Sequence, residues 1–313
     1  MIVYILLAGG LGNQFFQYSA AASMNPLKIV FVDLIANARV GADGKPDILN
    51  FQLPISIEYK KYKVNPIVRR ILWSFLGSSS SDSKIRKRIF LNRISVMLCQ
   101  KLLNLILKDK LKLFISKNNG FSPLPSNETI KNYFFIGYFQ SYLYAQKLLP
   151  YKKSIVLINP SVQAKNFYEH IAFNEINSSV QLRGGDYLTN LSFGRLSIDY
   201  LKIVVSEYFS KNKKIVIFSD DIKLITRFIT SFDLKYEIAP ETLSPAETLE
   251  AMRKMKTYVI SNSTFGWWGA YLSEFETPLV IAPEPWFMGQ STPEHLLPPN
   301  WTKTRSIFDG PGA

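Results

Sequence analysis

Short apolar runs alternate with amphipathic stretches along most of the chain. In the first half, apolar runs at 2–7 and 28–32 flank a segment at 14–24 whose apolar residues recur at helical spacing. This pattern predicts a strand, a helix and a second strand. A βαβ start of this kind implies parallel pairing and an open α/β sheet.

The second half shows the same alternation more clearly, and it predicts a doubly wound parallel sheet. Strands are expected at 179–182, 215–218, 236–239, 258–260 and 279–282, and helices near 198–209, 222–232, 245–255 and 265–275. The third of these helices has a start signal, with Ser244 as cap, Pro245 in the first turn and Glu247 reaching back. We therefore expect an N-terminal α/β domain at 1–155 and a C-terminal one at 156–313.

The composition changes at about 60–119, where 15 Lys or Arg residues stand against 2 Asp residues. The apolar residues of this basic insertion recur at roughly helical spacing: Ile71, Leu72, Trp73, Phe75, Leu76, Ile94, Leu98, Leu102 and Leu105. Solvated helices packed on the first domain would explain this pattern, and so would a basic amphipathic surface that rests on anionic lipid. Nucleic-acid binding is the least favoured interpretation.

Bulk properties restrict the partner and the compartment. The chain of 313 residues is 47% apolar with a net charge of +13, so we expect an ordered protein with an acidic partner. Cys99 is the only cysteine, which excludes an internal disulfide and fits a reducing compartment. The apolar start lacks a basic lead-in, and no apolar run is long enough to span a bilayer. We expect a cytoplasmic protein, either soluble or peripheral.

Polar and glycine-rich segments follow the predicted strands, where ligands bind in open α/β sheets. These segments are 9–14, 183–187, 219–221, 261–264 and 283–287. Arg183 offers the bidentate donors that suit a diphosphate, and the two glycines after it allow a sharp turn and leave space for a ligand. Asp186 could hold the guanidinium in place. The alternative is an ordinary surface Arg–Asp pair.

The segment 261–264 leads into a predicted helix, and a helix N-terminus suits a phosphate group. The hydroxyls of Ser263 and Thr264 could donate to phosphate oxygens. Plain capping of the helix by either residue is the alternative, and the paired Trp267 and Trp268 would belong to the core by default.

Gly10 and Gly12 after the first strand partly match a dinucleotide-binding turn. Phe15 stands at the third glycine position, where a bulky side chain prevents close helix–sheet packing, so nicotinamide or flavin binding is disfavoured. The amides of Asn13 and Gln14 instead suit a hydroxyl-rich ligand, because an amide both donates and accepts.

We expect no metal site and no bound cofactor. The chain has two histidines, His170 and His295, and no Asp-x-Asp motif. The adjacent Asp220 and Asp221 point in different directions. A P-loop and a serine nucleophile elbow are also absent from the sequence.

Taken together, these segments resemble a known family. The motifs are GGLGNQFFQYSAA at 9–21, GYFQS at 137–141, LRGGDY at 182–187, FSDD at 218–221, SNSTFGWWGAYL at 261–272, APEPWF at 282–287 and LLPPNW at 296–301. Their combination resembles the bacterial α-1,2-fucosyltransferases of glycosyltransferase family eleven. The resemblance covers nearly the whole chain except the basic insertion.

The resemblance implies a GT-B-like fold, in which two Rossmann-like α/β domains face a cleft. It implies an inverting, metal-independent galactoside α-1,2-fucosyltransferase that moves L-fucose from GDP-fucose to a 2-hydroxyl. The expected donor-binding residues are Gln181, Arg183, Ser219, Asp220, Asn262, Ser263, Thr264 and Phe265. The expected acceptor-binding residues are Gly10, Asn13, Gln14, Tyr138 and Gln140. Catalytic roles are expected for Arg183 at the pyrophosphate, for Asp186, and for Asn13, which could orient the acceptor hydroxyl.

Three positions depart from the family pattern. Gln181 stands in place of a histidine, Gly184 in place of a second arginine and Gly266 in place of a common serine. These departures leave open a transferase that uses another GDP-sugar, or a catalytically weakened glycan-binding homologue. The expected partners are a GDP-sugar, a galactoside on O-antigen or another surface glycan, and an anionic membrane surface, without nucleic acid.

Overall fold

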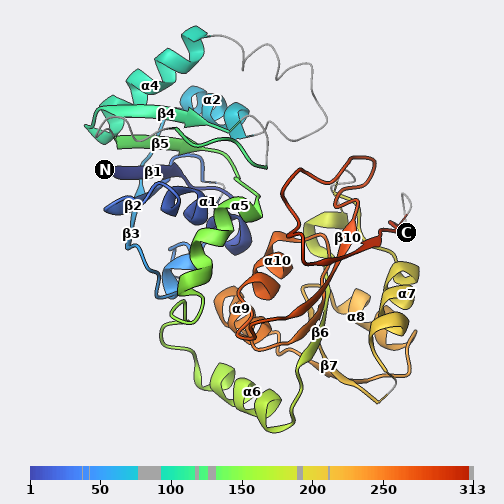
Figure 1. The fold of residues 1–313 in the computed structure, drawn as a ribbon. Coiled ribbons are helices and arrows are strands. Elements are labelled where there is room, and N and C mark those ends of the chain that lie inside the picture. Colours follow the sequence, from blue (N-terminus) through green and yellow to red (C-terminus); the bar gives the residue numbers. More distant parts are fainter. Residues whose placement is uncertain are drawn as a thin grey trace. The chain divides into compact units, whose positions relative to one another are not determined.

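The computed structural model describes residues 1–36, 38–41, 43–76, 93–116, 120–125, 132–188, 193–210 and 212–309. The chain forms two compact units, the N-terminal one comprising 1–49, 53–154 and 294–296, and the C-terminal one comprising 50–52, 155–293 and 297–313. The segments 50–52 and 294–296 therefore each belong to a different unit from the residues on either side of them in the sequence. Each unit has a parallel sheet with helices packed against it (Figure 1).

The N-terminal unit contains a five-stranded sheet in the order β3-β2-β1-β5-β4. Its strands are β1 (Ile2–Leu6), β2 (Lys28–Asp33), β3 (Ile57–Lys61), β4 (Leu111–Ile115) and β5 (Asn132–Ile136), and every pair is parallel. Its helices are α1 (Leu11–Ala22), α2 (Pro66–Leu76), α4 (Arg93–Leu107) and α5 (Tyr142–Ala145), with 3-10 turns η1 (Asp47–Asn50) and η2 (Gln146–Tyr151).

Alternate residues of this sheet face two different sets of helices. Tyr4, Val30 and Phe134 pack in one buried cluster with residues from α2 and α4, so those two helices cover that face (Figure 1). The helix α1 contacts α5 and the strands β1 and β2. Both faces of the sheet are therefore covered, as a parallel sheet requires.

The C-terminal unit contains a six-stranded parallel sheet in the order β11-β10-β9-β6-β7-β8. Its strands are β6 (Ser178–Leu182), β7 (Lys214–Ser219), β8 (Lys235–Ile238), β9 (Thr257–Val259), β10 (Leu279–Glu284) and β11 (Thr302–Arg305). Its helices are α6 (Val162–Phe173), α7 (Ile198–Tyr208), α8 (Ile222–Ile229), α9 (Pro245–Arg253) and α10 (Thr264–Tyr271), with the 3-10 turn η3 (Gly185–Leu188).

The prediction of two Rossmann-like α/β domains is confirmed, and the five strands and four helices predicted in the second half are all present within a few residues of their expected bounds. The start signal of α9 is a complete capping box between Ser244 and Glu247. The strand β11 and the helix α6 were missed. Within the described residues, no helix combines the length and the apolar character that crossing a membrane requires.

In its described residues the basic insertion forms the helices α2 and α4, as its periodicity predicts. However, its apolar residues do not form one buried stripe. Leu72 of α2 and Leu103 of α4 are buried, whereas Leu98 and Leu105 of α4 are 62% and 75% exposed. The predicted polar interruption at 78–81 and the cations Lys84, Arg86, Lys87, Arg88 and Lys117 lie outside the described residues.

Each sheet has one topological switch point, where the strand order changes direction. In the N-terminal sheet the chain runs outward from β1 to β3 and then fills the other side, so the switch point lies between β1 and β5. In the C-terminal sheet it lies between β6 and β9, because β7 and β8 follow on one side and β10 and β11 on the other. Ligands of open α/β sheets bind beyond the carboxyl ends of the strands at such points.

Candidate active-site residues

Arg183 lies directly after β6, at the switch point of the C-terminal sheet. Its Nη1 donates to Oδ2 of Asp220, which follows the neighbouring strand β7. The other carboxylate oxygen of Asp220 accepts from the backbone N–H of Gly184 at 3.0 Å. The guanidinium carbon also lies 5.5 Å from the ring centroid of Tyr187. These contacts fix the cation at the sheet edge and leave its side chain 16% exposed.

Gly184 and Gly185 are required because two carboxylates fill the space above them. A Cβ on Gly184 would lie 2.2 Å from Oδ2 of Asp221, and a Cβ on Gly185 would lie 2.6 Å from Oδ2 of Asp220. Gly185 also has a φ of +44°, which other residues rarely adopt. The space that we expected a ligand to occupy is therefore taken by protein. An arginine at position 184 would not fit beside Asp221.

The carboxylate seen to hold Arg183 is Asp220, whereas the sequence suggested Asp186. The side chain of Asp186 lies outside the described part of the chain. Asp221 has a separate role, because its Oδ1 caps α8 by accepting from the N–H of Leu224 at 3.1 Å. Ser219 stabilises the turn that contains Asp220 and Asp221, since its Oγ accepts from the N–H of Asp221 at 3.0 Å.

Gln181, the second-last residue of β6, connects the switch point to the loop before α10. Its Oε1 accepts from the backbone N–H of Ser261 at 3.2 Å and from the Ser261 hydroxyl at 2.6 Å. A Cβ on Gly266 would lie 2.1 Å from that same oxygen. Two of the departures from the family pattern are thus in contact, and the amide of Gln181 occupies the space that a serine side chain at position 266 would need.

Asn262 and Ser263 hold the start of α10 in place. The Asn262 side-chain amide donates to the carbonyls of Phe193, Gly194 and Trp286 at 2.9–3.0 Å. Ser263 caps the helix, because its hydroxyl accepts from the N–H of Phe265 at 3.3 Å.

Tyr187 ties this loop to the arginine segment by donating to the Asn262 carbonyl at 2.6 Å. Thr264 and Phe265 form the first, partly buried turn of α10. The structure therefore brings the donor-side residues predicted after β6, β7 and β9 to one edge. Trp267 and Trp268 are fully buried, as expected of core residues.

At the switch point of the N-terminal sheet, two predicted acceptor residues are in contact. The Nε2 of Gln140, after β5, donates to Oδ1 of Asn13, in the first turn of α1, at 2.9 Å. Gly9 has a φ of +78°, and a Cβ there would lie 2.4 Å from Nδ2 of Asn13. Among the described residues, Oε1 of Gln140 is buried and accepts no hydrogen bond. This edge therefore retains an unused acceptor, the group that a sugar hydroxyl can satisfy.

Gln14 is fully buried and bound to the protein itself. Its Nε2 donates to the carbonyls of Gly9 and Arg39 at 3.3 and 2.9 Å, and its Oε1 accepts from the N–H of Ile48 at 3.1 Å. Gln17, one turn further along α1, is likewise buried and joins β1 to the loop after β5. Gln14 therefore holds the backbone around this edge, while Asn13 is part of the edge itself. Tyr138 packs against the buried core of this unit.

Sequence reasoning missed two charged residues at this edge. A Cβ on Gly10 would lie 3.4 Å from Cδ of Arg39, and the N–H of Arg39 donates to the carbonyl of Gly9 at 3.0 Å. Asp47 is 4% exposed, and burial raises the pKa of its carboxyl to about 6, with a further contribution from the negative charge of Asp43. Both residues lie on the segment that Gln14 holds, and no sequence motif indicated either.

Two Rossmann-like units, each with polar side chains gathered at its switch point, define an α/β protein of the GT-B-like class. Within the described residues, no group of three or more His, Cys, Asp or Glu side chains is placed to bind a metal ion. A sequence model described as "Glycosyl transferase family 11" matches residues 2–305. The chain belongs to this family and is a glycosyltransferase.

Known proteins of similar sequence come from Escherichia coli. An α-1,2-colitosyltransferase is 30% identical over 309 residues, which cover 91% of this chain and 92% of that protein. The O-antigen biosynthesis glycosyltransferase WbnK is 26% identical over 304 residues, with 92% and 96% covered. Among solved structures, the fucosyltransferase NodZ from Bradyrhizobium superimposes with a TM-score of 0.45 at 12% identity, with 89% and 94% covered.

Proposed function

We propose that this glycosyltransferase moves L-fucose from GDP-fucose to the 2-hydroxyl of a galactoside during synthesis of a bacterial surface glycan. The observation that carries the proposal is the ion pair between Arg183 and Asp220 at the switch point of the C-terminal sheet. A fixed guanidinium at this place suits a nucleoside diphosphate better than any neutral ligand. Membership of family 11 and the similarity to an O-antigen glycosyltransferase support the class of product.

On the donor side, we assign the pyrophosphate to Arg183 and to the start of α10. The guanidinium has five N–H donors, of which Asp220 accepts at least one. The first turn of α10 adds backbone N–H groups with a partial positive charge. Gln181, Ser219 and Asn262 support this position through hydrogen bonds to the neighbouring loops.

On the acceptor side, we assign the galactoside to the edge formed by Asn13 and Gln140. The unused Oε1 of Gln140 can accept from a sugar hydroxyl, and the Asn13 amide can orient the hydroxyl that reacts. The fixed geometry of this pair would provide the orientation that an intermolecular transfer requires.

The proposed reaction is a single displacement with inversion at fucose C1. The bond between C1 and the β-phosphate oxygen breaks, its electron pair remains on GDP, and the acceptor oxygen forms the new bond to C1. The acceptor proton leaves late, to water. Negative charge grows on the departing phosphate, where Arg183 stabilises it in the manner of an oxyanion donor. We propose that these donors replace a metal ion.

A second donor is GDP-colitose, which differs from GDP-fucose by lacking the 3-hydroxyl. The specific reason to consider it is the 30% identity to an α-1,2-colitosyltransferase. The same similarity supports a 1,2 linkage for either donor. The departures at Gln181 and Gly266 bear on this choice only indirectly, because the two residues contact each other beneath the loop before α10.

Product analysis tests the proposal. The purified protein is incubated with GDP-fucose or GDP-colitose and a small panel of β-galactosides, and the linkage is determined by nuclear magnetic resonance. We expect an α-1,2-linked fucoside, formed equally well with and without EDTA. Transfer only from another GDP-sugar would show that GDP-fucose is not the donor. A strict Mg²⁺ or Mn²⁺ requirement would contradict metal independence. The absence of both turnover and GDP-induced thermal stabilisation would favour a glycan-binding homologue.

A further inference from the structure

The helices α2 and α4 carry large apolar side chains on the arcs that face away from the sheet. Ile67, Ile71 and Trp73 of α2 are 69%, 36% and 37% exposed. On α4, Met97, Leu98 and Leu105 are 59%, 62% and 75% exposed. Their opposite arcs contribute Leu72, Phe75, Leu76, Cys99 and Leu103 to the buried cluster against the sheet.

The two arcs belong to one surface. Both helices pack on the same face of the N-terminal sheet and contact each other, so their outward arcs point away from that face together (Figure 1). We call the six exposed apolar residues and the cations between them the α2/α4 face. The cations are Arg69, Arg70, Lys101 and Lys108, all of them exposed.

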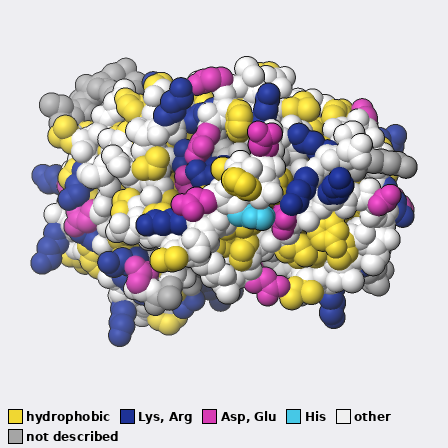
Figure 2. Space-filling view, turned by 90° about the horizontal axis from the view of Figure 1, so that it is seen from below, with side chains coloured by type: hydrophobic (Ala, Val, Ile, Leu, Met, Phe, Trp, Pro, Cys, Tyr) yellow, Lys and Arg dark blue, Asp and Glu magenta, His cyan; other side chains and the backbone are white. Residues whose placement is uncertain are grey.

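Positive charges outnumber negative ones on the α2/α4 face. Neither α2 nor α4 contains an Asp or Glu residue. Asp109, directly after Lys108, adds one negative charge beside the face, and its Oδ2 accepts from the Tyr4 hydroxyl at 3.0 Å and from the Asn132 amide at 2.7 Å. By contrast, the side of the molecule seen in Figure 2 has acidic side chains lying among the basic ones. The α2/α4 face is therefore complementary to an anionic partner.

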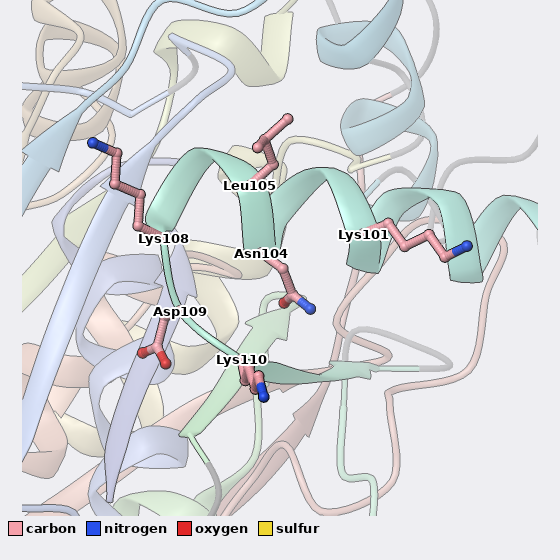
Figure 3. A pocket seen from close by; sticks show the side chains of 6 residues that line it. All are labelled: Lys101, Asn104, Leu105, Lys108, Asp109 and Lys110. Carbon is pink, nitrogen blue, oxygen red and sulfur yellow. The ribbon is translucent and has the colours of Figure 1, made fainter.

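A depression of about 640 Å³ lies at the C-terminal end of α4, and its lining residues are Lys101, Asn104, Leu105, Lys108, Asp109 and Lys110 (Figure 3). The three lysine side chains point in different directions and do not converge on one position (Figure 3). A divergent set of ammonium groups beside exposed leucines suits an extended anionic surface better than a single bound anion.

We infer that the α2/α4 face binds the surface of an anionic phospholipid bilayer. The apolar side chains enter the boundary between headgroups and acyl chains, while the cations contact the phosphates. Lys101 and Leu105 lie one turn apart on α4 and Lys108 follows the helix directly, so cationic and apolar side chains are close enough for both contacts to form together. This inference does not depend on the proposed sugar transfer, because an inactive chain would bind in the same way.

Vesicle binding tests the inference directly. The full chain is sedimented with vesicles of phosphatidylcholine alone and with vesicles containing about one third phosphatidylglycerol. We expect binding to the anionic vesicles, and a fall of about tenfold or more in the partition coefficient between low and high salt. No sedimentation with the anionic vesicles would overturn the inference.

Two variants separate the contributions, and a third is a matched control. Replacing Met97, Leu98 and Leu105 by Ser, or Arg69, Arg70, Lys101 and Lys108 by Ser, should each weaken vesicle binding at least tenfold. The control replaces Val162 and Phe173 of α6, which are 74% and 87% exposed, by Ser and should leave vesicle binding unchanged. Unchanged binding by both test variants would place the contact elsewhere. A wild-type dimer that the Met97 variant converts to a monomer, without loss of vesicle binding, would make this face a protein interface.

Trp73 supplies a local readout. Of the five tryptophans, the other four are at most 6% exposed. A blue shift of the emission on adding anionic vesicles should therefore come from α2 and should disappear in Trp73→Phe. Vesicle binding that leaves the emission unchanged would show that α2 takes no part.

Discussion

At the switch point of the N-terminal sheet, the side chains that meet across two strands are the neutral amides of Asn13 and Gln140. At the switch point of the C-terminal sheet, they are the guanidinium of Arg183 and the carboxylate of Asp220. Both points lie between two neighbouring parallel strands at which the strand order changes direction. The difference lies in the chemistry of the residues that follow the strands.

This difference indicates how one fold can provide two kinds of binding edge. Amides donate and accept without a charge, which suits the hydroxyls of a sugar. A guanidinium fixed by a carboxylate suits an anion with paired oxygens. Each edge also has a buried supporting amide whose oxygen accepts from the protein itself: Gln14 in one and Gln181 in the other.

We call the Arg183–Asp220 edge of the C-terminal sheet the charged edge and the Asn13–Gln140 edge of the N-terminal sheet the neutral edge. The largest effect is expected when the charged edge loses Arg183. Arg183→Ala should lower kcat by about 10²–10³, as the loss of one oxyanion donor does. Arg183→Lys should also be poorly active, because an ammonium group cannot supply the planar fork of donors. Steady-state kinetics with saturating donor provide the measurement.

Arg227→Ala is the matched control for lost positive charge, since Arg227 is an exposed residue of α8 in the same unit. Its kinetics should stay close to those of the unmodified protein. Near-normal turnover by Arg183→Ala at saturating donor would show that the cation of the C-terminal edge does not serve the reaction, and the contrast between the two edges would lose its functional meaning.

Asp47 is a buried carboxyl on the loop that Gln14 holds beside the amide pair, and Asp47→Asn tests its protonation. The pKa of Asp47 is raised from 3.8 to about 6, so the folded chain holds this proton more tightly than the unfolded chain. Stability is therefore lost as the pH rises from about 4 to 6, and the cost above that window is at most ~3 kcal/mol.

Asp47→Asn should remove that cost. Chemical denaturation at a series of pH values should find the variant more stable than the wild type at pH 7.5, with the difference vanishing near pH 4. Taking the difference between the two proteins cancels the titration of all other groups. A variant that is less stable at pH 7.5 would mean that ionised Asp47 is stabilised by its surroundings.

The contact between Gln181 and Gly266 predicts a coupled pair at the charged edge. Gly266→Ser places a side chain within 2.1 Å of the Gln181 oxygen and should cost about 1–3 kcal/mol, the range for overpacking. Gln181→Ala removes that oxygen, so Gly266→Ser should cost much less in the Gln181→Ala background. Urea denaturation of the two single variants and the double variant measures the coupling energy. Additive effects would show that the serine finds another position.

Strand periodicity and the rule that ligands bind beyond strand ends indicated the segments after β1, β6, β7 and β9. Gln140 was indicated only by the family resemblance, because β5 was not predicted. The sequence suggested Asp186 as the partner of Arg183 and did not indicate Asp220. Asp186 is close in sequence, but Asp220 is brought alongside by the pairing of β6 with β7. From the sequence alone, Asn13 and Gln14 were equally plausible as acceptor-binding residues. Gln14 and Gln17 then proved to lie one turn apart, both fully buried.

Segments with weak patterns were the other failures. The four-residue strand β11 is only partly buried, so it lacks the apolar run that identified its neighbours. In α4, apolar residues occupy both the buried and the exposed arc, so their spacing predicted the helix but not which of them are buried. Arg39 and Asp47 lie on a loop without a recurrent motif, and only the hydrogen bonds of Gln14 and Gly9 connect that loop with the edge.

The smallest effect is expected at the amide pair. Asn13→Ala and Gln140→Ala should each raise the acceptor KM or lower kcat by about fivefold to tenfold, because each removes one neutral hydrogen bond worth roughly 1 kcal/mol. Hydrolysis of the donor without an acceptor should not change, since the charged edge is intact. Because the two amides bond each other at 2.9 Å, the double variant should lose less than the product of the single losses. Full acceptor kinetics in both single variants, or a matching loss of donor hydrolysis, would contradict the assignment of the neutral edge to the acceptor.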